Sequence, residues 1–452
     1  MMRVSVIGTG YVGLVSGACL AHLGHSVVCV DVDPRKVDMI VNRNPPIYER
    51  GLQELLDANV PARLTATTDL RKAVLESDLS LIAVGTPFDG QFIDLKYIRQ
   101  AAREIGEALK DKASWHMVVV KSTVVPGTTT DVVLPILEEA SGKKAGVDFG
   151  VGMNPEFLRE GEAIEDFMVP DRIVLGGIDN RSIDALAELY AVFDKTDIVR
   201  TDPRTAEMIK YTANSLLATL ISFSNEIANL CAVQKVDVAE AMRGVHLDRR
   251  FSPILKDGTR VTPGFVSYVW PGAGFGGSCF PKDVKALVAH GETGGVPMQL
   301  LRSVIEVNDR QPQKMIDMLE HAVGDVAGMH VTVLGVAFKP GTDDIRESPS
   351  LPVIQALADK GAIVTAFDPI ARKEAEHALG SAVAFRDTLS EAINGSRAIL
   401  LMTAWPEFRG LPDLLAARGA DAPLLIDGRR MLDKTSVPNY AGIGLQAMGT
   451  AP

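Results

Sequence analysis

The sequence predicts an α/β protein in which two doubly wound, Rossmann-like domains are joined by a long central helix. Short apolar runs alternate with amphipathic stretches through residue 152, and the same alternation returns from His330. Between these regions, residues 205–233 contain no Gly and no Pro, and their apolar residues recur at helical spacing. Alternating strand and helix segments are typical of parallel sheets that helices cover on both faces.

The first predicted domain, 1–202, contains five short apolar runs that read as strands. A glycine-rich turn and a helix-like stretch to about Gly24 separate the first two runs, which makes a β-turn-α-β unit. The predicted strands are 3–7, 26–30, 79–84, 117–121 and 148–152.

The predicted middle region, 203–325, begins with the long helix. At 1.5 Å per residue this helix would span roughly 40–45 Å, enough to join two domains and to pack against a second subunit. Residues 249–278 follow, rich in Gly, Pro and basic side chains, and read as an ordered loop.

The last predicted domain, 326–452, repeats the α/β pattern on a smaller scale and lacks the glycine pattern of the first. We expect a helix through 350–360 and strands within 330–338, 362–368, 398–404 and 423–428.

Composition excludes several classes of protein. With 46% hydrophobic and 23% charged residues the chain reads as soluble and globular, and a net charge of −11 argues against nucleic acid as a partner. Four scattered cysteines suit neither a disulfide scaffold nor a zinc site and favour a cytoplasmic location. The eight histidines have no metal-ligand spacing, so no metal is expected. No transmembrane span is predicted, and the apolar N-terminal stretch reads as strand, turn and helix rather than a signal peptide.

A dinucleotide-binding fingerprint follows the first predicted strand. Gly8, Gly10 and Gly13 form a G-x-G-x-x-G string that opens a helix, and the next strand ends at Asp31. The glycines let the backbone approach a pyrophosphate, and the helix N-terminus supplies amide donors. An acidic residue at Asp31 should accept hydrogen bonds from a ribose and repel a 2′-phosphate, so the pattern predicts NAD rather than NADP.

The string from Gly272 to Asp283, GAGFGGSCFPKD, is the most informative in the chain. Pro281 suits the first turn of a helix, which places Cys279 at a helix N-terminus. There the helix dipole and Lys282 should lower the pKa of the thiol and make Cys279 a nucleophile. The glycines, Gly276 among them, allow an anionic ligand to approach the backbone, and Asp283 could face the same site one turn later.

Lys210 and Asn214 are spaced four apart on the long helix and share one face. Positive charge and hydrogen-bond donors beside a cysteine suit the stabilisation of a developing alkoxide. Alone, the two would read as a solvated surface; with the cysteine loop they favour a catalytic role.

Other polar groups gather at predicted strand ends. Glu156 and Glu160 follow the last strand of the first domain, where ligands of open α/β sheets bind, and could hold sugar hydroxyls or serve as a general base. Helix capping is the alternative, mainly for Glu156. The strand ends at Thr86 and Thr123 reach the same edge. Basic residues before the cysteine could bind a diphosphate or simply be solvated, and basic residues follow the first strand of the last domain: Arg249, Arg250, Lys256, Arg260, Lys339 and Arg346.

Seven ordered motifs resemble those of the UDP-glucose/GDP-mannose 6-dehydrogenase family, over residues 3 to about 430. They are GTGYVG, VGTP, KSTVVPGTT, NPEFLREG, EMIKYTAN, GFGGSCFPKD and FKPGTDDIRESPS. This resemblance implies an NAD-dependent, four-electron oxidation of a nucleoside-diphosphate hexose to its uronate. Cys279 would form first a thiohemiacetal and then a thioester with C6 of the sugar.

The resemblance also implies a homodimer formed through the long central helix, which could build into a higher homo-oligomer, and it implies roles for single residues. Lys210, Asn214 and Asp283 would stabilise the oxyanion and manage water, while Thr123 and Glu160 would take part in proton transfer and hydrolysis. The implied NAD contacts are Gly8, Gly10, Tyr11, Val12, Gly13, Asp31, Lys36, Thr86, Thr123 and Arg346. The implied substrate contacts are Glu156, Phe157, Leu158, Lys210, Asn214, Arg260, Gly276 and Lys339, with Arg260 able to reach a neighbouring subunit.

The substrate expected first is UDP-glucose, with GDP-mannose as the alternative. Leu217 and the segment 169–177 resemble the UDP-glucose branch, whereas 141–152 and 268–272 resemble the GDP-mannose branch. Ser278, before the cysteine, argues against N-acetylated sugars, whose enzymes usually carry histidine there. Two rivals remain: a non-catalytic NAD-binding protein, which would not need the cysteine, lysine and asparagine together, and a two-electron hydroxy-acid dehydrogenase, which would not need the cysteine loop.

Overall fold

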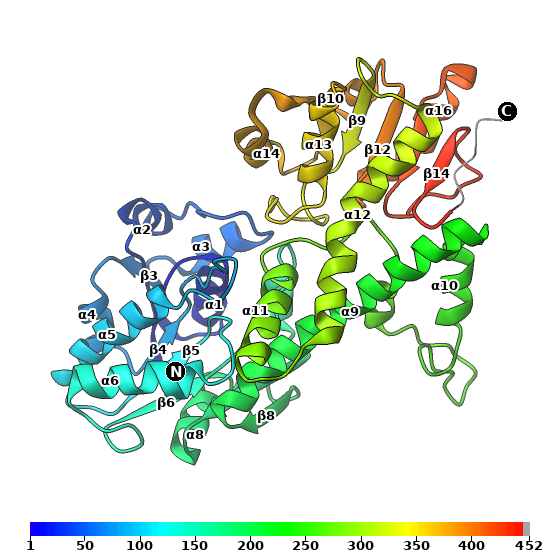
Figure 1. The fold of residues 1–452 in the computed structure, drawn as a ribbon. Helices are drawn as coiled ribbons and strands as arrows, with labels where there is room; N and C mark the ends of the chain where they lie inside the picture. Colours follow the sequence, from blue (N-terminus) through cyan, green and yellow to red (C-terminus); the bar gives the residue numbers. More distant parts are fainter. Residues whose placement is uncertain (446–452) are drawn as a thin grey trace. The chain divides into compact units, whose positions relative to one another are not determined.

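The chain divides into two compact units, Met1–Ala213 and Asn214–Pro452, and a computed structural model describes residues 1–445 (Figure 1). Helix α9 (Pro203–Gln234) begins in the first unit and continues into the second. Each unit is built around one sheet with its own core.

The first unit holds an eight-stranded sheet in the order β3-β2-β1-β4-β5-β6-β7-β8. Its first six positions have the strand order of dinucleotide-binding folds. All neighbouring strands are parallel except β6 and β7, which run antiparallel. The strands are β1 (Arg3–Ile7), β2 (Ser26–Val30), β3 (Leu64–Thr67), β4 (Leu79–Ile82), β5 (His116–Val120), β6 (Phe149–Met153), β7 (Arg172–Gly177) and β8 (Asp197–Thr201).

Both faces of the central strands β1, β4, β5 and β6 are buried, which explains why these strands read as continuous apolar runs. In β5, Met117 and Val119 join one core, whereas Val118 and Val120 join the other. The first core includes side chains of α1, α3, α7 and α8, and the second those of α4, α5 and α6. The helices are α1 (Tyr11–His22), α2 (Pro34–Val41), α3 (Leu52–Asn59), α4 (Leu70–Glu76), α5 (Lys96–Lys110), α6 (Leu134–Ser141), α7 (Ala163–Met168) and α8 (Asn180–Leu189), with the π-helix η1 (Thr128–Val133) before α6.

The second unit holds a six-stranded, all-parallel sheet in the order β11-β10-β9-β12-β13-β14. Relative to the chain this is the order of the first six strands of the other sheet. The strands are β9 (His330–Leu334), β10 (Ile363–Phe367), β11 (Ala384–Phe385), β12 (Ala398–Leu401), β13 (Leu424–Asp427) and β14 (Tyr440–Gly442).

Helices surround the second sheet and also precede it in the chain. The α-helices of this part are α10 (Val238–His246), α11 (Phe280–Thr293), α12 (Gln299–Val323), α13 (Ser350–Asp359), α14 (Arg372–Leu379), α15 (Leu389–Ala392) and α16 (Leu411–Ala416). The short 3-10 helices are η2 (Gly264–Tyr268), η3 (Gly380–Ala382), η4 (Pro406–Gly410) and η5 (Gly419–Asp421). Side chains of α12 and α13 join one core of the sheet and those of η4 and α16 the other.

Helix α9 is long and apolar enough to cross a membrane by length and composition, with 33% of its most apolar stretch buried. A core helix of a soluble protein passes the same test, so this single helix is weak evidence for a membrane.

The predicted fold class is confirmed, with local corrections. The strand runs and the long helix agree with the structure to within a few residues. The first sheet is not purely parallel, because β7 reverses against β6. The loop predicted at 249–278 contains the short helix η2 and an isolated bridge between Ile254 and Arg260.

Candidate active site

The glycine turn of the first unit is shaped by contacts that leave room for no side chain at two of its three glycines. Gly8 has φ +99°, and a Cβ there would lie 2.7 Å from the carbonyl oxygen of Ala83. A Cβ on Gly13 would lie 2.0 Å from the carbonyl oxygen of Gly8. Gly10 has nothing within 4 Å of that position. The first two glycines are therefore required by the fold, whereas Gly10 leaves open space for a ligand.

Asp31, which follows β2, faces this turn. Its carboxylate accepts hydrogen bonds from the backbone N–H of Thr9 (2.9 Å), the hydroxyl of Thr9 (2.5 Å) and the backbone N–H of Asp33 (3.0 Å). Burial raises the pKa of Asp31, but these hydrogen bonds and Lys36, 3.8 Å away, outweigh it and lower the pKa. The side chain is thus held as an anion, as a ribose-binding acceptor must be.

The other predicted cofactor contacts of this unit are brought to the sheet edge or held by neighbours. Thr86 donates its hydroxyl to the carbonyl oxygen of Thr123 at 2.9 Å, so these two predicted residues do meet. The hydroxyl of Tyr11 bonds to the carboxylate of Glu49 and accepts the N–H of Gly161 at 2.9 Å. Val12 is half-buried in the first turn of α1.

Glu156 and Lys210, predicted separately, form a buried ion pair of 2.9 Å with side chains 4% exposed. Burial alone would raise the pKa of Glu156, but Lys210 and the N–H of Leu158 (2.7 Å) reverse this, and the pKa is lowered. The ammonium of Lys210 also lies 5.5 Å from the ring centre of Phe157. Glu160 is buried in the same segment. The unit therefore gathers one lysine and a carboxylate-rich segment after β6.

Lys121 is a buried residue beside this pair that sequence reasoning passed over. Its ammonium donates to Asn154 Oδ1 at 2.9 Å, and burial lowers the pKa of Lys121 to about 8. A lysine at the end of the apolar run MVVVK was the available signal.

In the second unit, Cys279 is the N-cap residue of α11, as predicted, with Pro281 in the first turn. Its thiol is partly exposed, whereas Cys19, Cys29 and Cys231 are buried. Burial raises the pKa of the Cys19 and Cys29 thiols to about 12. Accessibility therefore separates Cys279 from the other three.

Asp283 lies one turn into α11 and is 1% exposed. It accepts a hydrogen bond from Asn214 Nδ2 at 2.7 Å, so these two predicted residues are in contact. Lys282, which is predicted to lower the pKa of the thiol, forms an ion pair with Asp283 at 2.6 Å. Its charge is thus shared with a carboxylate.

The glycine loop, defined as residues 272–277, packs tightly against the segment that follows β9. A Cβ on Gly276 would lie 2.2 Å from the carbonyl oxygen of Glu347, and one on Gly277 would lie 2.7 Å from the ring of Phe338. The N–H of Gly277 donates to the carbonyl of Arg346 at 2.8 Å. Gly276 is therefore required by packing, whatever it binds.

Three further predicted cations of this unit, Arg346, Lys339 and Arg260, contact neighbouring groups. The guanidinium of Arg346 forms a bidentate pair with Asp344, with both N–O distances 2.8 Å. Lys339 lies 6.0 Å from the ring centre of Phe338. Arg260, an exposed residue, donates to the carbonyls of Leu247 (2.8 Å) and Ser252 (2.9 Å).

Arg429 was also missed, although it directly follows the apolar run PLLIDG. Its guanidinium donates to the carbonyl of Gly274 at 3.0 Å, and burial lowers its pKa to about 10. Its Nη2 is buried with no hydrogen-bond partner among the described residues, so this donor is unused there. The sequence predicts a strand at this run, but it gives no signal for the contacts of the arginine that follows.

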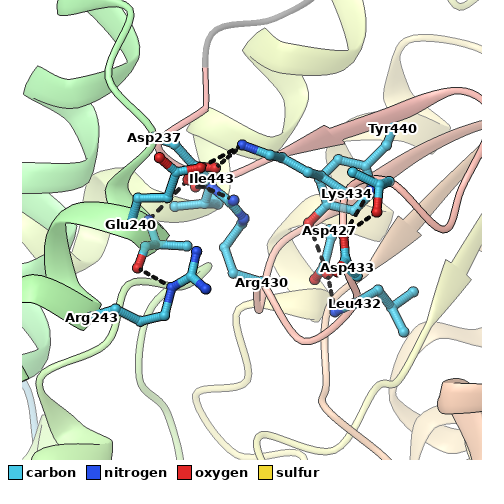
Figure 2. A network of polar contacts seen from close by, with 12 residues as sticks. Asp237, Glu240, Arg243, Asp427, Arg430, Leu432, Asp433, Lys434, Tyr440 and Ile443 are labelled. Atoms are coloured by element: carbon cyan, nitrogen blue, oxygen red, sulfur yellow. Dashed lines mark hydrogen bonds and ion pairs between the residues drawn. The ribbon is translucent and has the colours of Figure 1, made fainter.

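A polar network braces the segment that carries Arg429 (Figure 2). Asp237, the N-cap of α10, accepts from Arg430 at 2.7 Å and from Lys434 at 2.8 Å, while Asp427 accepts the N–H of Leu432 at 3.0 Å. Arg430 and Asp237 are both buried, so removing either partner would leave an uncompensated buried charge.

The fold and glycine turn of the first unit are those of a dinucleotide-binding protein. Comparison with known proteins assigns a family to all three parts of the chain. Three family profiles match in order: the UDP-glucose/GDP-mannose dehydrogenase family NAD binding domain (residues 2–194), central domain (204–310) and UDP binding domain (332–434). The chain belongs to the UDP-glucose/GDP-mannose dehydrogenase family. The predictions of an oxidoreductase of this family and of NAD as its cofactor are confirmed.

Individual relatives lie on both branches of the family. A UDP-glucose 6-dehydrogenase of Haloferax volcanii is 41% identical over 98% of this chain and 100% of its own length. A GDP-mannose 6-dehydrogenase of Pseudomonas savastanoi is 45% identical over 81% of both chains. Among solved structures, a UDP-glucose dehydrogenase of Pyrobaculum islandicum has a TM-score of 0.89 at 39% identity and 98% coverage of both chains.

Proposed function

We propose that this enzyme oxidises the C6 hydroxymethyl group of UDP-glucose to the carboxylate of UDP-glucuronate, with Cys279 as covalent nucleophile. The observation that carries the proposal is a partly exposed cysteine at the N-cap of α11, followed one turn later by the buried, hydrogen-bonded Asp283. A non-catalytic NAD-binding protein would have no use for this arrangement.

The need for a nucleophile follows from electron counting. Oxidation of an alcohol to a carboxylate removes four electrons, and bound NAD supplies a hydride acceptor that takes two at a time. The aldehyde must therefore be retained between two oxidations. Attack by the Cys279 thiolate forms a carbon–sulfur bond at C6 and places the charge on the former carbonyl oxygen. The adduct keeps a C–H bond for the second oxidation, and water then cleaves the resulting thioester to carboxylate and thiol.

The residues in contact with one another suggest how this chain assists. We propose that Lys210, Asn214 and Asp283 stabilise the oxyanion and order water, since each is buried and hydrogen-bonded or ion-paired. Thr123 and Glu160 are proposed for proton transfer and hydrolysis. Substrate contacts are proposed for Glu156, Phe157, Leu158, Arg260, Gly276 and Lys339.

The first unit fits NAD by its own geometry. Open space at Gly10, donors at the start of α1 and an anionic Asp31 suit a pyrophosphate and a ribose. Tyr11, Val12, Lys36, Thr86 and Arg346 are proposed as further contacts.

The proposal extends to organisation and location. We propose functional parts at 1–202, 203–325 and 326–452, and a cytoplasmic enzyme. We also propose a homodimer formed through α9, because Leu216, Phe223 and Leu230 are exposed at seven-residue spacing (58%, 51% and 56%). A stripe repeating every seven residues is the pattern by which one helix packs along another.

Product stoichiometry tests the four-electron chemistry. We expect two NADH for each sugar nucleotide consumed, with no free aldehyde, when absorbance and product mass are followed together. One NADH with released aldehyde would contradict the role of Cys279.

The identity of the sugar nucleotide is tested separately. Leu217, half-buried on α9, offers no hydrogen bond to an axial 2-hydroxyl, which favours UDP-glucose. The 45% identity to a GDP-mannose enzyme makes GDP-mannose the second candidate. An unmade buried hydrogen bond costs about 1–3 kcal/mol, so kcat/KM should differ by roughly ten- to a hundredfold. A tenfold preference for GDP-mannose would reverse the assignment.

A further inference from the structure

The glycine loop has no regular secondary structure, yet its backbone groups are hydrogen-bonded to side chains and backbone of other segments. Within the second unit, the N–H of Ala273 donates to the carbonyl of Gly428 at 2.9 Å, and Arg429 donates to that of Gly274. The other partners are three buried or half-buried carboxamides, on α9 and α12.

Asn308 pairs with both backbone groups of one residue. Its Oδ1 accepts the N–H of Phe275 at 2.8 Å, and its Nδ2 donates to the carbonyl of Phe275 at 3.0 Å. The side chain thus takes the place that a neighbouring strand would have in a sheet. A carboxamide is the side chain that can both accept and donate in this way.

Asn225 and Gln311 bracket a second residue in the same manner, one from each helix. Asn225 Oδ1 accepts the N–H of Gly272 at 2.7 Å, and Gln311 Nε2 donates to its carbonyl at 2.9 Å. Both carboxamide residues are 0% exposed. A second bond orients Gln311, whose Oε1 accepts from Asn229 at 3.1 Å.

Gly274 lies between the two bracketed residues and fits directly against α12. It has φ +108°, and a Cβ there would lie 3.1 Å from Asn308 Oδ1 and 3.5 Å from Gln311 Cβ. The loop therefore follows the surface of α12 without space for adjustment. Four residues after Phe275 the chain reaches Cys279.

We infer that Asn225, Asn308 and Gln311 are positioning residues, whose carboxamides fix the glycine loop so that Cys279 is held at the N-cap of α11. This inference rests on the nucleophilic role proposed for Cys279. None of the three is assigned contact with substrate; each acts through the loop. We expect Asn308 to contribute most to this positioning, because it bonds both the N–H and the carbonyl of Phe275, which of the two bracketed residues is nearer to Cys279.

The test measures the pH dependence of Cys279 alkylation by iodoacetamide in the full-length protein, without NAD or sugar. The other three cysteines are buried, and peptide mass mapping confirms the labelled residue. In Asn308→Ala we expect the alkylation midpoint to rise by about half a pH unit, because the thiolate loses the favourable helix N-terminus. Alkylation below the midpoint then slows about threefold.

Asn59→Ala is the matched control. Asn59 is 3% exposed and donates to the carbonyl of Leu55 at 2.8 Å, within its own helix α3. Its loss should lower the thermal midpoint of unfolding, as Asn308→Ala does, and leave the alkylation profile unchanged. Asn308→Asp and Gln311→Ala are further variants, with the smaller shift expected in Gln311→Ala.

The inference would be wrong if the folded Asn308 variants lost stability as the control does but kept an unchanged alkylation midpoint. The three carboxamides would then contribute to stability without positioning Cys279. If both Asn308 variants fail to fold, Gln311→Ala decides by the same criterion. Because no substrate is present, an error in the proposed sugar or stoichiometry leaves this result intact.

Discussion

The first strands of the two sheets, β1 and β9, are followed by similar glycine turns, but the aspartates beside these turns differ in their hydrogen bonds. Each sheet begins with a central strand that runs into a glycine of positive φ, Gly8 at +99° and Gly335 at +89°. The N–H of each glycine donates to the end of the neighbouring strand, at Val30 (2.7 Å) and Phe367 (2.8 Å). An aspartate follows that neighbouring strand soon afterwards in both units.

The aspartates differ in how many donors they already serve. Asp31 accepts three hydrogen bonds, two of them from Thr9. Asp368 accepts five, and four come from backbone N–H groups and one from Trp405 Nε1. A carboxylate offers about four lone pairs, so Asp368 is saturated by the protein, whereas Asp31 retains capacity for a ribose. The same strand-and-turn arrangement therefore places an aspartate that can accept hydrogen bonds from a cofactor in one unit, and an aspartate that stabilises the fold in the other.

The largest expected effect separates cofactor binding from chemistry. In Cys279→Ala we expect acid formation to fall by about 10⁴-fold or more, because no thiol remains to retain the aldehyde. The dissociation constant for NAD should stay within about twofold, since the glycine turn lies in the other unit. Turnover by coupled product assay and NAD binding by calorimetry give the two values, and near-normal turnover would rule out the nucleophile.

A matched pair of isosteric changes tests the aspartates themselves. Asp31→Asn should weaken NAD binding about tenfold with a small change in stability, because an amide offers fewer acceptor sites. Asp368→Asn should lower the free energy of unfolding by about 2–4 kcal/mol and leave NAD affinity unchanged, because its NH₂ would face donors. Equal losses of NAD affinity in both variants would show that Asp31 and Asp368 do not differ in their roles in cofactor binding.

A third hydrogen-bonded carboxylate, Glu207 on α9, adds a pH dependence of smaller size. It accepts from the N–H of Gly127 (2.6 Å) and from the N–H and hydroxyl of Thr129 (2.8 and 2.6 Å). Burial raises its pKa to about 7, although these bonds and Arg204 oppose the shift. Because the folded pKa exceeds the unfolded value, its contribution to stability is full below about pH 4.5 and is lost as pH rises through about 7.

Glu207→Gln should remove this dependence. Relative to the wild type, the variant should gain roughly 2 kcal/mol of unfolding free energy between pH 5 and pH 8, as measured by urea titration. The exposed Glu107→Gln on α5 is the control and should show no such trend. Parallel pH profiles for Glu207→Gln and the wild type would show that Glu207 does not titrate in this range.

Much of the fold could be predicted because local patterns were strong. The glycine-free, proline-free stretch at 205–233 became α9, and the buried runs became strands. Strands β3, β7 and β8 of the first sheet were not predicted, and in β8 all but the last residue are exposed and no apolar run marks the strand. The 25-residue helix α12 contains Pro312, which lacks the N–H used in a helix interior and therefore reads locally as a break.

Site residues could be predicted from the sequence only where a residue type and its local motif indicate a function. Cys279, Asp31 and the glycine turn were found from spacing. The pairing of Lys210 with Glu156, across 54 positions of sequence, depends on the tertiary fold and left no local trace. Asn308 and Gln311 lie on a helix with ordinary polar spacing, so their hold on the glycine loop is visible only in three dimensions.

The burial of Cys19, Cys29 and Cys231 leaves the sulfur of Cys279 as the one accessible thiol among the described residues. A sulfenic acid formed at Cys279 would meet no second accessible cysteine among the described residues, so an internal disulfide would not protect it from further oxidation. Inactivation by peroxide should therefore follow one chemical event per chain, and its reversal would depend on thiols supplied by the surroundings.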